Sequence, residues 1–295
     1  MLTSVVVVTM NSGAGVHECL ARILASTAAA EIVVVDNASD DGSLDRLVSA
    51  FDGNEHVRIL RNERNLGFGA ACNRGAAVAR GDALLFLNPD CLLAVDTIAR
   101  LRAMLDDDNH IGAVGALQED ARGTVDPASR RRDPLLRRAL ATMSGLARLG
   151  ARWPVFSGVN VYPKDAVGAT VDVDAISGAL MLIPAVVFSK VGGFDEGYFL
   201  HCEDLDLSRR IRDAGYRVVC ANDIRVVHRK GGSSRQRPVF VAWHKHRGMW
   251  RWFTKFDPAA HNPLLRSFVW CGIWSAFALK LPLLCARRLF AAPAT

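Results

Sequence analysis

Acidic residues stand at two places in this sequence where a carboxylate could take part in catalysis. Asp90 ends the motif "FLNPD", and Glu203 and Asp204 begin "EDLDL". A carboxylate such as Asp90 offers the hard oxygen ligand that Mg²⁺ or Mn²⁺ binds, and such an ion neutralises the charge that builds on a departing diphosphate. An ionised carboxylate beside a hydroxyl acts as a general base. Together the two places indicate metal-assisted group transfer.

Each of these acids also has a structural interpretation. Asp90 follows Pro89, which cannot extend a strand, so Asp90 could simply cap the next helix. Glu203, Asp204 and Asp206 crowd the expected start of another helix, where the helix macrodipole favours anions. Capping explains one acid more readily than three beside a glycine-rich and aromatic loop, so we favour a catalytic role at 203–204.

One histidine could complete a metal site. His228 ends an expected strand and precedes "RKGGSS". An isolated histidine is usually structural. Asn88 and Asp90 are a weak metal pair by themselves, however, and an imidazole is a suitable additional ligand.

Polar residues also follow the second and third expected strands. Asp36 and Asn37 come directly after "VVV", where a carboxylate could accept from a base N3–H or from ribose hydroxyls. An Asx turn with a helix cap explains the same residues. Asn65 and Gly67 make a tight turn into a helix N-terminus, where backbone N–H groups can approach a ligand, although helix packing is an equal alternative.

Alternating apolar and amphipathic segments place these residues at one edge of a sheet. The apolar runs predict strands at 4–9, 31–36, 56–60, 82–88 and 111–116. The stretches between them predict helices at 15–27, 41–51, 68–80 and 94–107. This alternation indicates a parallel sheet with helices on both faces, which binds ligands at the carboxyl ends of its strands.

The second half of the chain is less regular. Residues 118–170, rich in Arg, Pro and Gly, predict a long loop region over the site. The remaining segments predict a strand-like stretch at 171–184, a helix at 203–215 closed by Gly215, strands at 216–222 and 224–230, a helix at 238–255 and an apolar tail at 264–290.

Composition narrows the possible partners. Half of the 295 residues are hydrophobic and 22% are charged, which favours a sizeable core over disorder. The net charge of +6 is concentrated in 129–138 and in the last sixty residues, as suits diphosphates, acidic lipid headgroups or nucleic acid.

Seven cysteines without a CxxC pair indicate reduced thiols and no structural zinc. Glu18 stands where a dinucleotide-binding fingerprint requires its third glycine.

The C-terminal tail predicts contact with a membrane. Residues 267–290 are apolar, are interrupted by Lys280 and Pro282, and are followed by Arg287 and Arg288. This run is marginal for a spanning helix and fits an in-plane anchor on the inner leaflet better, with a dimer or core helix as the alternative. Residues 243–256 mix cations with aromatics, which favours packing or a membrane surface over nucleic acid. The N-terminus lacks signal-peptide features, so we expect a cytoplasmic protein.

Several segments, in this order, resemble those of family-2 glycosyltransferases of the GT-A fold. They are "VVVVTMN", "VVVDNASDDGS", "NLGFGAACNRG", "FLNPD", "SGALMLIP", "GGFDEGYFLHCEDLDLSRRIRDAGY" and "VVHRKGGSS". Within the family the chain is most similar to bacterial rhamnosyltransferases of the cell-wall and O-antigen type, over residues 3–255. The resemblance implies a Rossmann-like, mixed and mostly parallel sheet flanked by helices. We expect that domain at 1–237 and a helical, membrane-associating segment at 238–295.

The resemblance also implies a role for each matching residue. Contacts to the nucleotide-sugar are expected from Thr9, Asn11, Asp36, Asn37, Asn65, Gly67, Asn88 and Asp90. The Glu203–Asp204 pair would be catalytic, with Asp204 as the base, and Asp90 and His228 would hold the metal. Ser177 and Gly178 would border the acceptor. Asn88 replaces the first acid of the family's Asp-x-Asp motif, which gives His228 more weight.

The implied reaction is inverting transfer of a sugar, with L-rhamnose from a dTDP-linked donor favoured, to a saccharide on polyprenyl diphosphate. Arg130, with Arg131 and Arg132, could meet the acceptor's diphosphate.

A hexosyltransferase using a UDP- or GDP-sugar remains an alternative. A nucleotidyltransferase would need a cation in the loop after the first strand, which reads "MNSGAGVHE". A non-catalytic sugar- or lipid-binding protein would be expected to lose an acid at 90 or 204. The expected setting is the inner face of the plasma membrane, with a homodimer possible.

Overall fold

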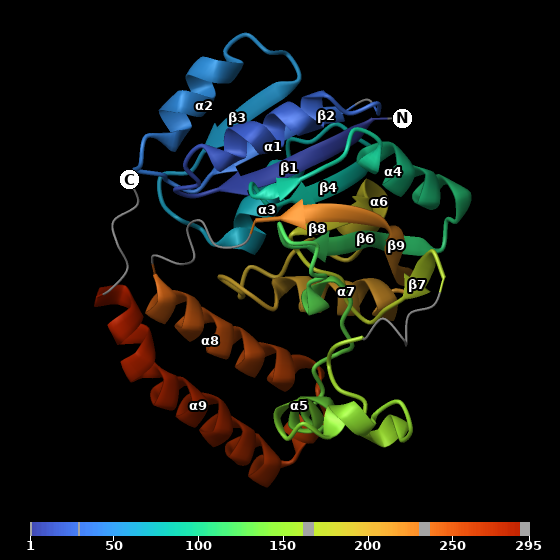
Figure 1. The fold of residues 1–295 in the computed structure, drawn as a ribbon, viewed down its shortest axis with the longest axis vertical. Helices are drawn as coiled ribbons and strands as arrows, with labels where there is room; N and C mark the ends of the chain where they lie inside the picture. Colours follow the sequence, from blue (N-terminus) through green and yellow to red (C-terminus); the bar gives the residue numbers. More distant parts are fainter. Residues whose placement is uncertain (1, 29, 162–167, 230–236, 290–295) are drawn as a thin grey trace.

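The computed structural model describes residues 2–28, 30–161, 168–229 and 237–289 (Figure 1). Over these residues the chain forms one mixed β-sheet with strand order β3-β2-β1-β4-β8-β6-β9-β5, and β7 pairs with β9. The strands are β1 (Thr3–Thr9), β2 (Ala30–Asp36), β3 (Val57–Arg61), β4 (Ala83–Leu87), β5 (Cys91–Leu92), β6 (Ile111–Glu119), β7 (Thr170–Asp172), β8 (Leu180–Pro184) and β9 (Arg217–His228).

Helices cover both faces of this sheet. The α-helices are α1 (Gly15–Leu24), α2 (Ser43–Phe51), α3 (Phe68–Ala76), α4 (Thr97–Asp107), α5 (Leu136–Met143), α6 (Ala185–Lys190), α7 (Glu203–Asp213), α8 (Pro238–Phe256) and α9 (Pro263–Leu289). Short 3₁₀ turns are η1 (Pro127–Ser129), η2 (Leu146–Leu149), η3 (Pro154–Phe156) and η6 (Pro258–His261). The expected helices at 15–27, 41–51, 68–80, 94–107, 203–215 and 238–255 are confirmed, with ends shifted by a few residues.

The central strands are apolar on both sides because both sides are covered. Val5 and Val7 of β1 lie in the cluster formed with α1, α2 and α4. Val6 and Val8 point the other way, into the cluster formed with α3, α6 and α7. Successive side chains of a strand alternate between faces, so a continuous valine run is typical of a strand buried on both faces.

The sheet is mixed and mostly parallel, as expected. The strands that share one direction are β1, β2, β3, β4, β6 and β9. The strands that run the opposite way are β5, β7 and β8. The carboxyl ends of β1, β2 and β4 therefore lie at one edge of the sheet.

Three expectations for the second half need correction. The two strands expected at 216–222 and 224–230 are one strand, β9, which continues past Asn222 through a register shift against β6. The stretch 171–184 holds two strands, β7 and β8, separated by a turn in which Ser177 O accepts from Leu180 N at 3.2 Å. Residues 118–170 are not all loop, since their described part contains α5, η1, η2 and η3.

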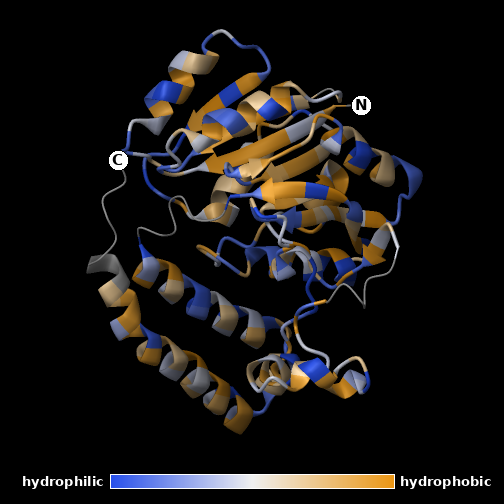
Figure 2. Cartoon of the chain, viewed as in Figure 1, coloured by the Kyte–Doolittle hydropathy of each residue, from blue (hydrophilic) through white to orange (hydrophobic). Residues whose placement is uncertain are grey.

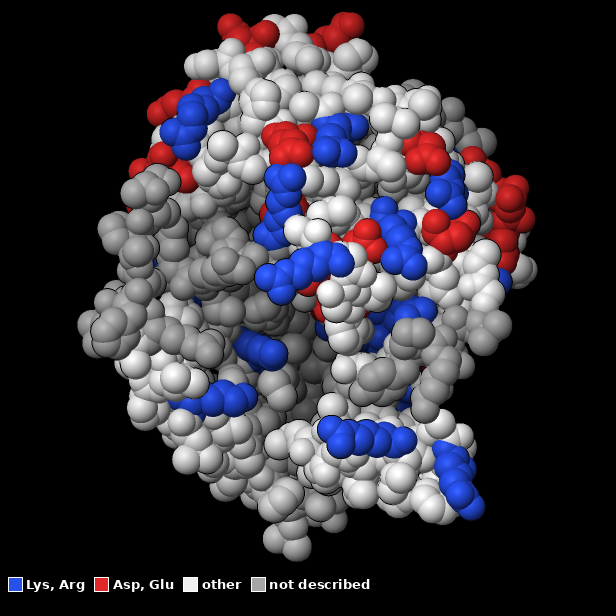
Figure 3. Space-filling model, in the orientation of Figure 1, with Lys and Arg blue, Asp and Glu red and all other residues white. Residues whose placement is uncertain are grey.

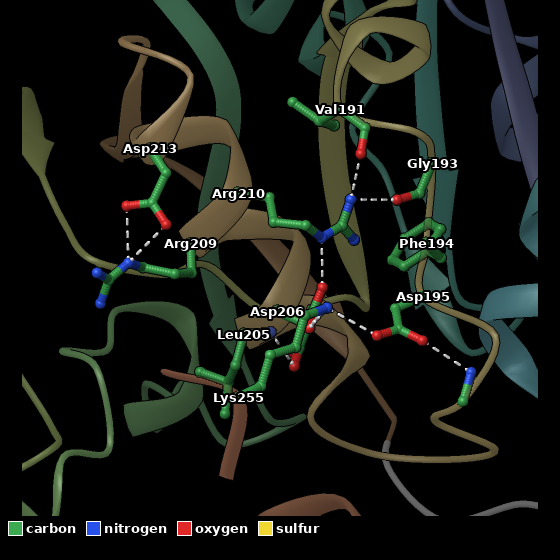
Figure 4. Close-up of polar contacts among 12 residues, drawn as sticks. Val191, Gly193, Phe194, Asp195, Leu205, Asp206, Arg209, Arg210, Asp213 and Lys255 are labelled. Carbon is green, nitrogen blue, oxygen red and sulfur yellow. Dashed lines mark hydrogen bonds and ion pairs between the residues drawn. The ribbon is translucent and has the colours of Figure 1, made fainter. Parts of the chain in front are cut away.

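A network of ion pairs joins α7 to α8 (Figure 4). Asp206 of α7 is fully buried and accepts from Arg210 Nε at 2.5 Å and from Lys255 Nζ of α8 at 2.6 Å. Lys255 also donates to Asp195 at 2.7 Å, and Arg251 donates to the same carboxylate at 2.8 Å. Asp206 is thus a structural acid that fixes α7, the helix that begins with Glu203 and Asp204.

A close backbone approach also holds α8 against the loop before α7. A Cβ added at Gly248 would lie 2.7 Å from the carbonyl oxygen of His201, closer than real Cβ atoms come. His201 and Cys202 have φ of 68° and 71°, in the left-handed region that L-residues seldom occupy. The loop therefore turns sharply under α8, immediately before the acid pair.

The last helix packs one side onto α8. Trp243 contacts Trp274 with ring centroids 4.8 Å apart and Phe277 at 5.7 Å. Most of α9 is hydrophobic (Figure 2), and among the described residues Pro263–Ala286 is the one helix whose length and composition would allow it to cross a membrane. Only 11% of its most apolar window is buried inside the protein.

Replacing Asp206 by Asn should destabilise the fold by about 3 kcal/mol, because Arg210 and Lys255 lose the counter-charge of a fully buried carboxylate. Asp213 on the same helix pairs with Arg209 but is 51% exposed, so Asp213→Asn should cost below about 1 kcal/mol. Urea denaturation of the two variants measures the difference. Equal losses would show that burial of Asp206 does not determine the stability of the α7–α8 contact.

Candidate active site

A cavity of about 230 Å³ lies at the carboxyl ends of β1, β2 and β4. Segments distant in sequence form its walls: Val8–Gly15, Asn37, Asn65–Phe68, Asn88–Asp90, Phe199–Leu200 and Arg237–Val241. The topology explains this convergence, since the first four segments each follow or approach a parallel strand end. The other two come from the loop before α7 and from the start of α8.

Most residues expected to contact the nucleotide-sugar line this cavity. They are Asn11, Asn37, Asn65, Gly67, Asn88 and Asp90. Thr9 and Asp36 are not among its lining residues. Thr9 Oγ1 donates to Ser12 Oγ at 2.8 Å, and the buried carboxylate of Asp36 accepts from Ser39 N at 3.0 Å and from Ser39 Oγ at 2.5 Å. In this conformation Asp36 shapes the turn after β2, and its contact with a base or ribose stays a prediction.

Asparagines hold the turn that enters α3. Asn37 Nδ2 donates to Gly67 O at 3.1 Å, and Asn37 Oδ1 accepts from Asn62 Nδ2 at 2.7 Å. Asn65 Oδ1 accepts from Gly67 N at 2.8 Å. Gly67 has φ of 87°, and a Cβ there would lie 2.5 Å from Phe199 O, so the position requires glycine for both reasons. Asn62 precedes the motif "NLGFGAACNRG", and no sequence signal assigned it this contact.

Asp90 and His228 are brought together by the pairing of β5 with β9. Cys91 is the partner of His228 in the antiparallel register, and Asp90 Oδ1 lies 3.1 Å from His228 Nε2. Gln118 Oε1 lies 3.3 Å from His228 Nδ1 and orients the ring. Asp90 Oδ1 is buried and, apart from this contact with His228, has no hydrogen-bond partner among the described residues.

These donors fit a divalent cation. The possible ligand atoms of Asp90, Cys91 and His228 lie within 4.8 Å of one another. Burial and the neighbouring Asp90 charge raise the pKa of the Cys91 thiol, which stays protonated and donates to Ala179 O at 3.4 Å. The ligands that this chain offers are therefore a carboxylate oxygen and an imidazole nitrogen, a set that suits Mn²⁺ or Mg²⁺ when phosphate oxygens complete it.

The structure distinguishes the two adjacent acids at the start of α7. Burial opposes ionisation of Asp204, but the Arg131 charge and hydrogen bonds from Gly178 N at 3.0 Å and Leu205 N at 2.8 Å outweigh it and lower the Asp204 pKa. Burial, together with the Asp204 charge, raises the pKa of Glu203 to about 8. At neutral pH Asp204 is thus the ionised carboxylate and Glu203 carries a proton.

Arg131, not Arg130, reaches the acid pair. The Arg131 guanidinium donates to Asp204 Oδ2 and, at 3.2 Å, to Ile176 O. Arg130 is 5% exposed and donates to Asn222 Oδ1 at 2.8 Å. The two neighbours point in opposite directions because the segment is extended where it bridges Ala175. The contact expected between Arg130 and an acceptor stays a prediction.

The turn at 177–179 connects the two acidic places. Gly178 N donates to Asp204, while Ala179 O accepts from Asn88 N at 2.9 Å. A Cβ on Gly178 would lie 3.2 Å from Asp204 Cβ and 3.6 Å from the Phe68 ring, which itself lines the cavity. Ser177 Oγ accepts from Ala179 N at 3.3 Å. Asp90 and Asp204 therefore flank one short turn beside one cavity.

Known proteins are similar to this chain in sequence. The family model described as "Glycosyl transferase family 2" matches residues 4–162. The N-acetylglucosaminyl-diphospho-decaprenol L-rhamnosyltransferase of Mycobacterium tuberculosis is 31% identical over 271 residues, which are 84% of this chain and 86% of that protein. Rhamnosyltransferase WbbL of Escherichia coli K12 is 28% identical over 151 residues, covering 51% of this chain and 53% of WbbL.

Solved structures share the fold. The mannosyltransferase PcManGT of Pyrobaculum calidifontis, solved with GDP-Man and Mn²⁺, has a TM-score of 0.60 at 20% identity and covers 99% of this chain and 75% of its own. Residues 1–349 of TarS from S. aureus have a TM-score of 0.57 at 17% identity, covering 98% and 87%. At these identities the likeness concerns the fold alone.

The raised pKa of Glu203 predicts a pH dependence of stability. Folding lifts this pKa from 4.5 to about 8, so the folded protein keeps a proton that the unfolded chain releases. The unfolding free energy of the wild type, relative to Glu203→Gln, should therefore fall as pH rises from about 4.5 to about 8. Urea denaturation across this range measures it, with the exposed Glu63→Gln as control. A difference that stays flat with pH contradicts the assignment of the proton to Glu203.

Proposed function

Since this chain belongs to glycosyl transferase family 2 and is a glycosyltransferase, we propose that it transfers L-rhamnose from a dTDP-linked donor to a lipid-linked saccharide. The support for the sugar is the names of two relatives, both rhamnosyltransferases. The support for the acceptor is the first of those names, which specifies N-acetylglucosamine on a decaprenyl diphosphate. A hexosyltransferase using a UDP- or GDP-sugar is the second candidate, because PcManGT of the same fold was solved with GDP-Man.

The observation that carries the mechanism is the 177–179 turn, whose Gly178 N–H donates to the Asp204 carboxylate and whose Ala179 carbonyl accepts from the Asn88 N–H. An acceptor hydroxyl at this turn would lie beside the ionised Asp204, which takes its proton. The hydroxyl oxygen forms a bond to the anomeric carbon as the bond from that carbon to the diphosphate oxygen breaks. Attack opposite the leaving group inverts the configuration. Ser177 and Gly178 form the acceptor edge in this proposal.

Asp90 and His228 would hold the divalent ion at the diphosphate. When bound, the ion supplies positive charge that stabilises the leaving group. Gln118 keeps the His228 ring in place, and the neutral imidazole would supply a ligand atom where Asn88 brings no carboxylate. Asn11, Asn37 and Asn65 line the rest of the donor cavity and offer amide donors and acceptors to the base and ribose.

Arg131 keeps the carboxylate of the proposed base, Asp204, ionised. Its charge lowers the Asp204 pKa, so the carboxylate is ionised before the acceptor arrives. The other arginines of the run are held elsewhere: Arg132 donates to Asn160 O at 3.1 Å, and Arg130 would have to leave Asn222 to meet an acceptor diphosphate.

We further propose that α9 lies in the plane of the inner leaflet of the plasma membrane and attaches the enzyme from the cytoplasmic side. One side of α9 packs on α8 through Trp274 and Phe277. The opposite side exposes large apolar side chains, among them Leu264, Phe268, Leu279 and Leu283. A helix with one side on the protein and one apolar side outward fits an interfacial position. A homodimer covering the same side is the alternative.

Replacing Asp204 by Asn should lower kcat by about 10²- to 10⁴-fold, because the acceptor hydroxyl loses its base. Donor affinity should stay close to that of the wild type, since Asp204 is not among the residues that line the cavity. Transfer assays with a lipid-linked N-acetylglucosamine acceptor and donor titration measure the two quantities. Asp213→Asn on the same helix serves as the control. Wild-type turnover in Asp204→Asn would remove Asp204 from the mechanism.

A thermal-shift panel of dTDP-, UDP- and GDP-sugars, with and without Mn²⁺, should rank the donors, because a ligand stabilises the folded state in proportion to RT ln(1 + [L]/Kd). We expect the largest shift with dTDP-rhamnose and a further shift on adding Mn²⁺. His228→Ala should abolish the Mn²⁺ increment, while the exposed His56→Ala should preserve it. A Mn²⁺ increment that survives His228→Ala would exclude His228 as a ligand.

A further inference from the structure

The segment of residues 133–160 leaves the body of the protein beside the catalytic base and returns to the same place. At its root, Arg132 N donates to Val159 O at 2.6 Å, and Val161 N donates to Arg130 O at 3.2 Å. Asp133 binds Arg209 at 3.0 Å and Arg212 at 2.6 Å, which attaches the root to α7. The root is thus fixed next to Arg131 and Asp204, while α5, η2 and η3 extend outward (Figure 1).

The outer part of this segment is apolar and exposed. Its exposed large side chains are Leu140 (47%), Met143 (78%), Leu146 (42%), Leu149 (42%), Trp153 (47%) and Val155 (55%). Of the large hydrophobic side chains exposed elsewhere in the described residues, all but Leu24, Val48, Val95 and Val186 belong to α8 and α9. Exposed apolar surface is therefore concentrated in two places that adjoin each other, and such a concentration marks an interaction surface.

The charge of the segment has one sign. No Asp or Glu occurs between Asp133 and Asp165. Arg148 and Arg152 are exposed within the apolar group, and the Arg152 guanidinium lies 5.3 Å from the centroid of the Trp153 ring. In Figure 3, acidic side chains lie in the upper part of the view, and in the lower part only basic side chains are coloured. Apolar side chains among cations, without acids, complement an anionic lipid surface.

The segment and α9 form one continuous surface. Leu136 N donates to Asp257 Oδ2 at 2.5 Å, at the end of α8. The Leu136 side chain packs against the cluster of Phe253, Ala260 and Val269, which joins α8, η6 and α9. The position of α5 relative to α9 is therefore fixed by contacts and does not depend on a flexible link.

We propose that residues 140–155 are a second membrane contact, whose partner is an anionic bilayer surface. This inference rests on the proposed attachment through α9 and extends it. With both contacts in the bilayer, the root of the segment holds Arg131 and Asp204 at a fixed height above the headgroups, where the sugar of a lipid-linked acceptor is presented. A second copy of the chain fits less well as partner, because a two-fold contact would set the arginines of one copy against those of the other.

The test is flotation of the full-length protein with vesicles of phosphatidylcholine containing phosphatidylglycerol. The triple variant Met143→Ser, Leu149→Ser, Trp153→Ser should lower the partition coefficient at least about tenfold, because three inserted apolar groups are lost. The matched control is Val48→Ser, Val95→Ser, Val186→Ser, which removes equally exposed apolar groups elsewhere. Its partitioning should equal that of the wild type.

A charge-reversal variant tests the same surface without removing apolar groups. Arg148→Glu with Arg152→Glu should weaken binding to vesicles that contain phosphatidylglycerol and change binding to pure phosphatidylcholine little. Wild-type flotation of both variants, or a wild type that does not float, overturns the proposal. A triple variant that floats normally but changes from dimer to monomer also overturns it, since the surface would then join two copies.

Failure of the surface is distinguishable from failure of the proposed function. Flotation requires no turnover. The triple variant should retain wild-type transfer to an acceptor with a short, water-soluble chain and lose transfer to the same sugar on a long polyprenyl chain in vesicles. Equal transfer to both acceptors by the triple variant would reject the membrane contact and leave the proposed function intact. No transfer to either acceptor by the wild type would reject the proposed function and leave the membrane contact intact.

Discussion

The ion pair between Arg131 and Asp204 determines how the rest of the site works. Glu203 and Asp204 are adjacent and almost excluded from water, and two such carboxylates cannot both carry a charge at low cost. Arg131 decides between them by stabilising the charge on Asp204, which leaves the proton on Glu203. The Gly178 N–H adds to this preference. Which of the two carboxylates is ionised, and so could serve as the proposed base, is therefore selected by a side chain more than seventy positions away in the sequence.

The first half of the fold could be predicted from sequence because its pattern is local. The apolar runs of β1, β2 and β4 are short and buried on both faces, and helices of the expected period lie between the strands. The edge strand β3 is only partly buried, but its apolar run is equally local. The second half depends on pairing between distant segments. Asn222 is a turn residue by propensity, yet β6 holds β9 in one strand across it through a register shift. The helical turns of 136–156 were missed because most of their large apolar side chains face outward, so the usual buried stripe is lacking.

The candidate site divides in the same way. Asn37, Asn65, Asn88 and Asp90 follow strand ends or turns, and the rule that ligands bind at carboxyl edges was enough to find them. Choosing Arg131 over Arg130 required knowing which neighbour faces Asp204, and that depends on the bridge to Ala175. Phe199 and Phe240 line the cavity from the loop before α7 and from α8. No local pattern relates either aromatic ring to a nucleotide pocket.

The absence of a side chain at Gly248 lets α8 lie directly against the loop before α7. The helix backbone touches the His201 carbonyl with no side chain between them, and the ion pairs of Lys255 fasten the same helix further along. Because of these two contacts, we expect α8 and the start of α7 to move as one rigid unit. With Asp204 as the proposed base and α9 as the proposed membrane contact, the tilt of the C-terminal helices would also set the angle at which the Asp204 carboxylate meets its substrate.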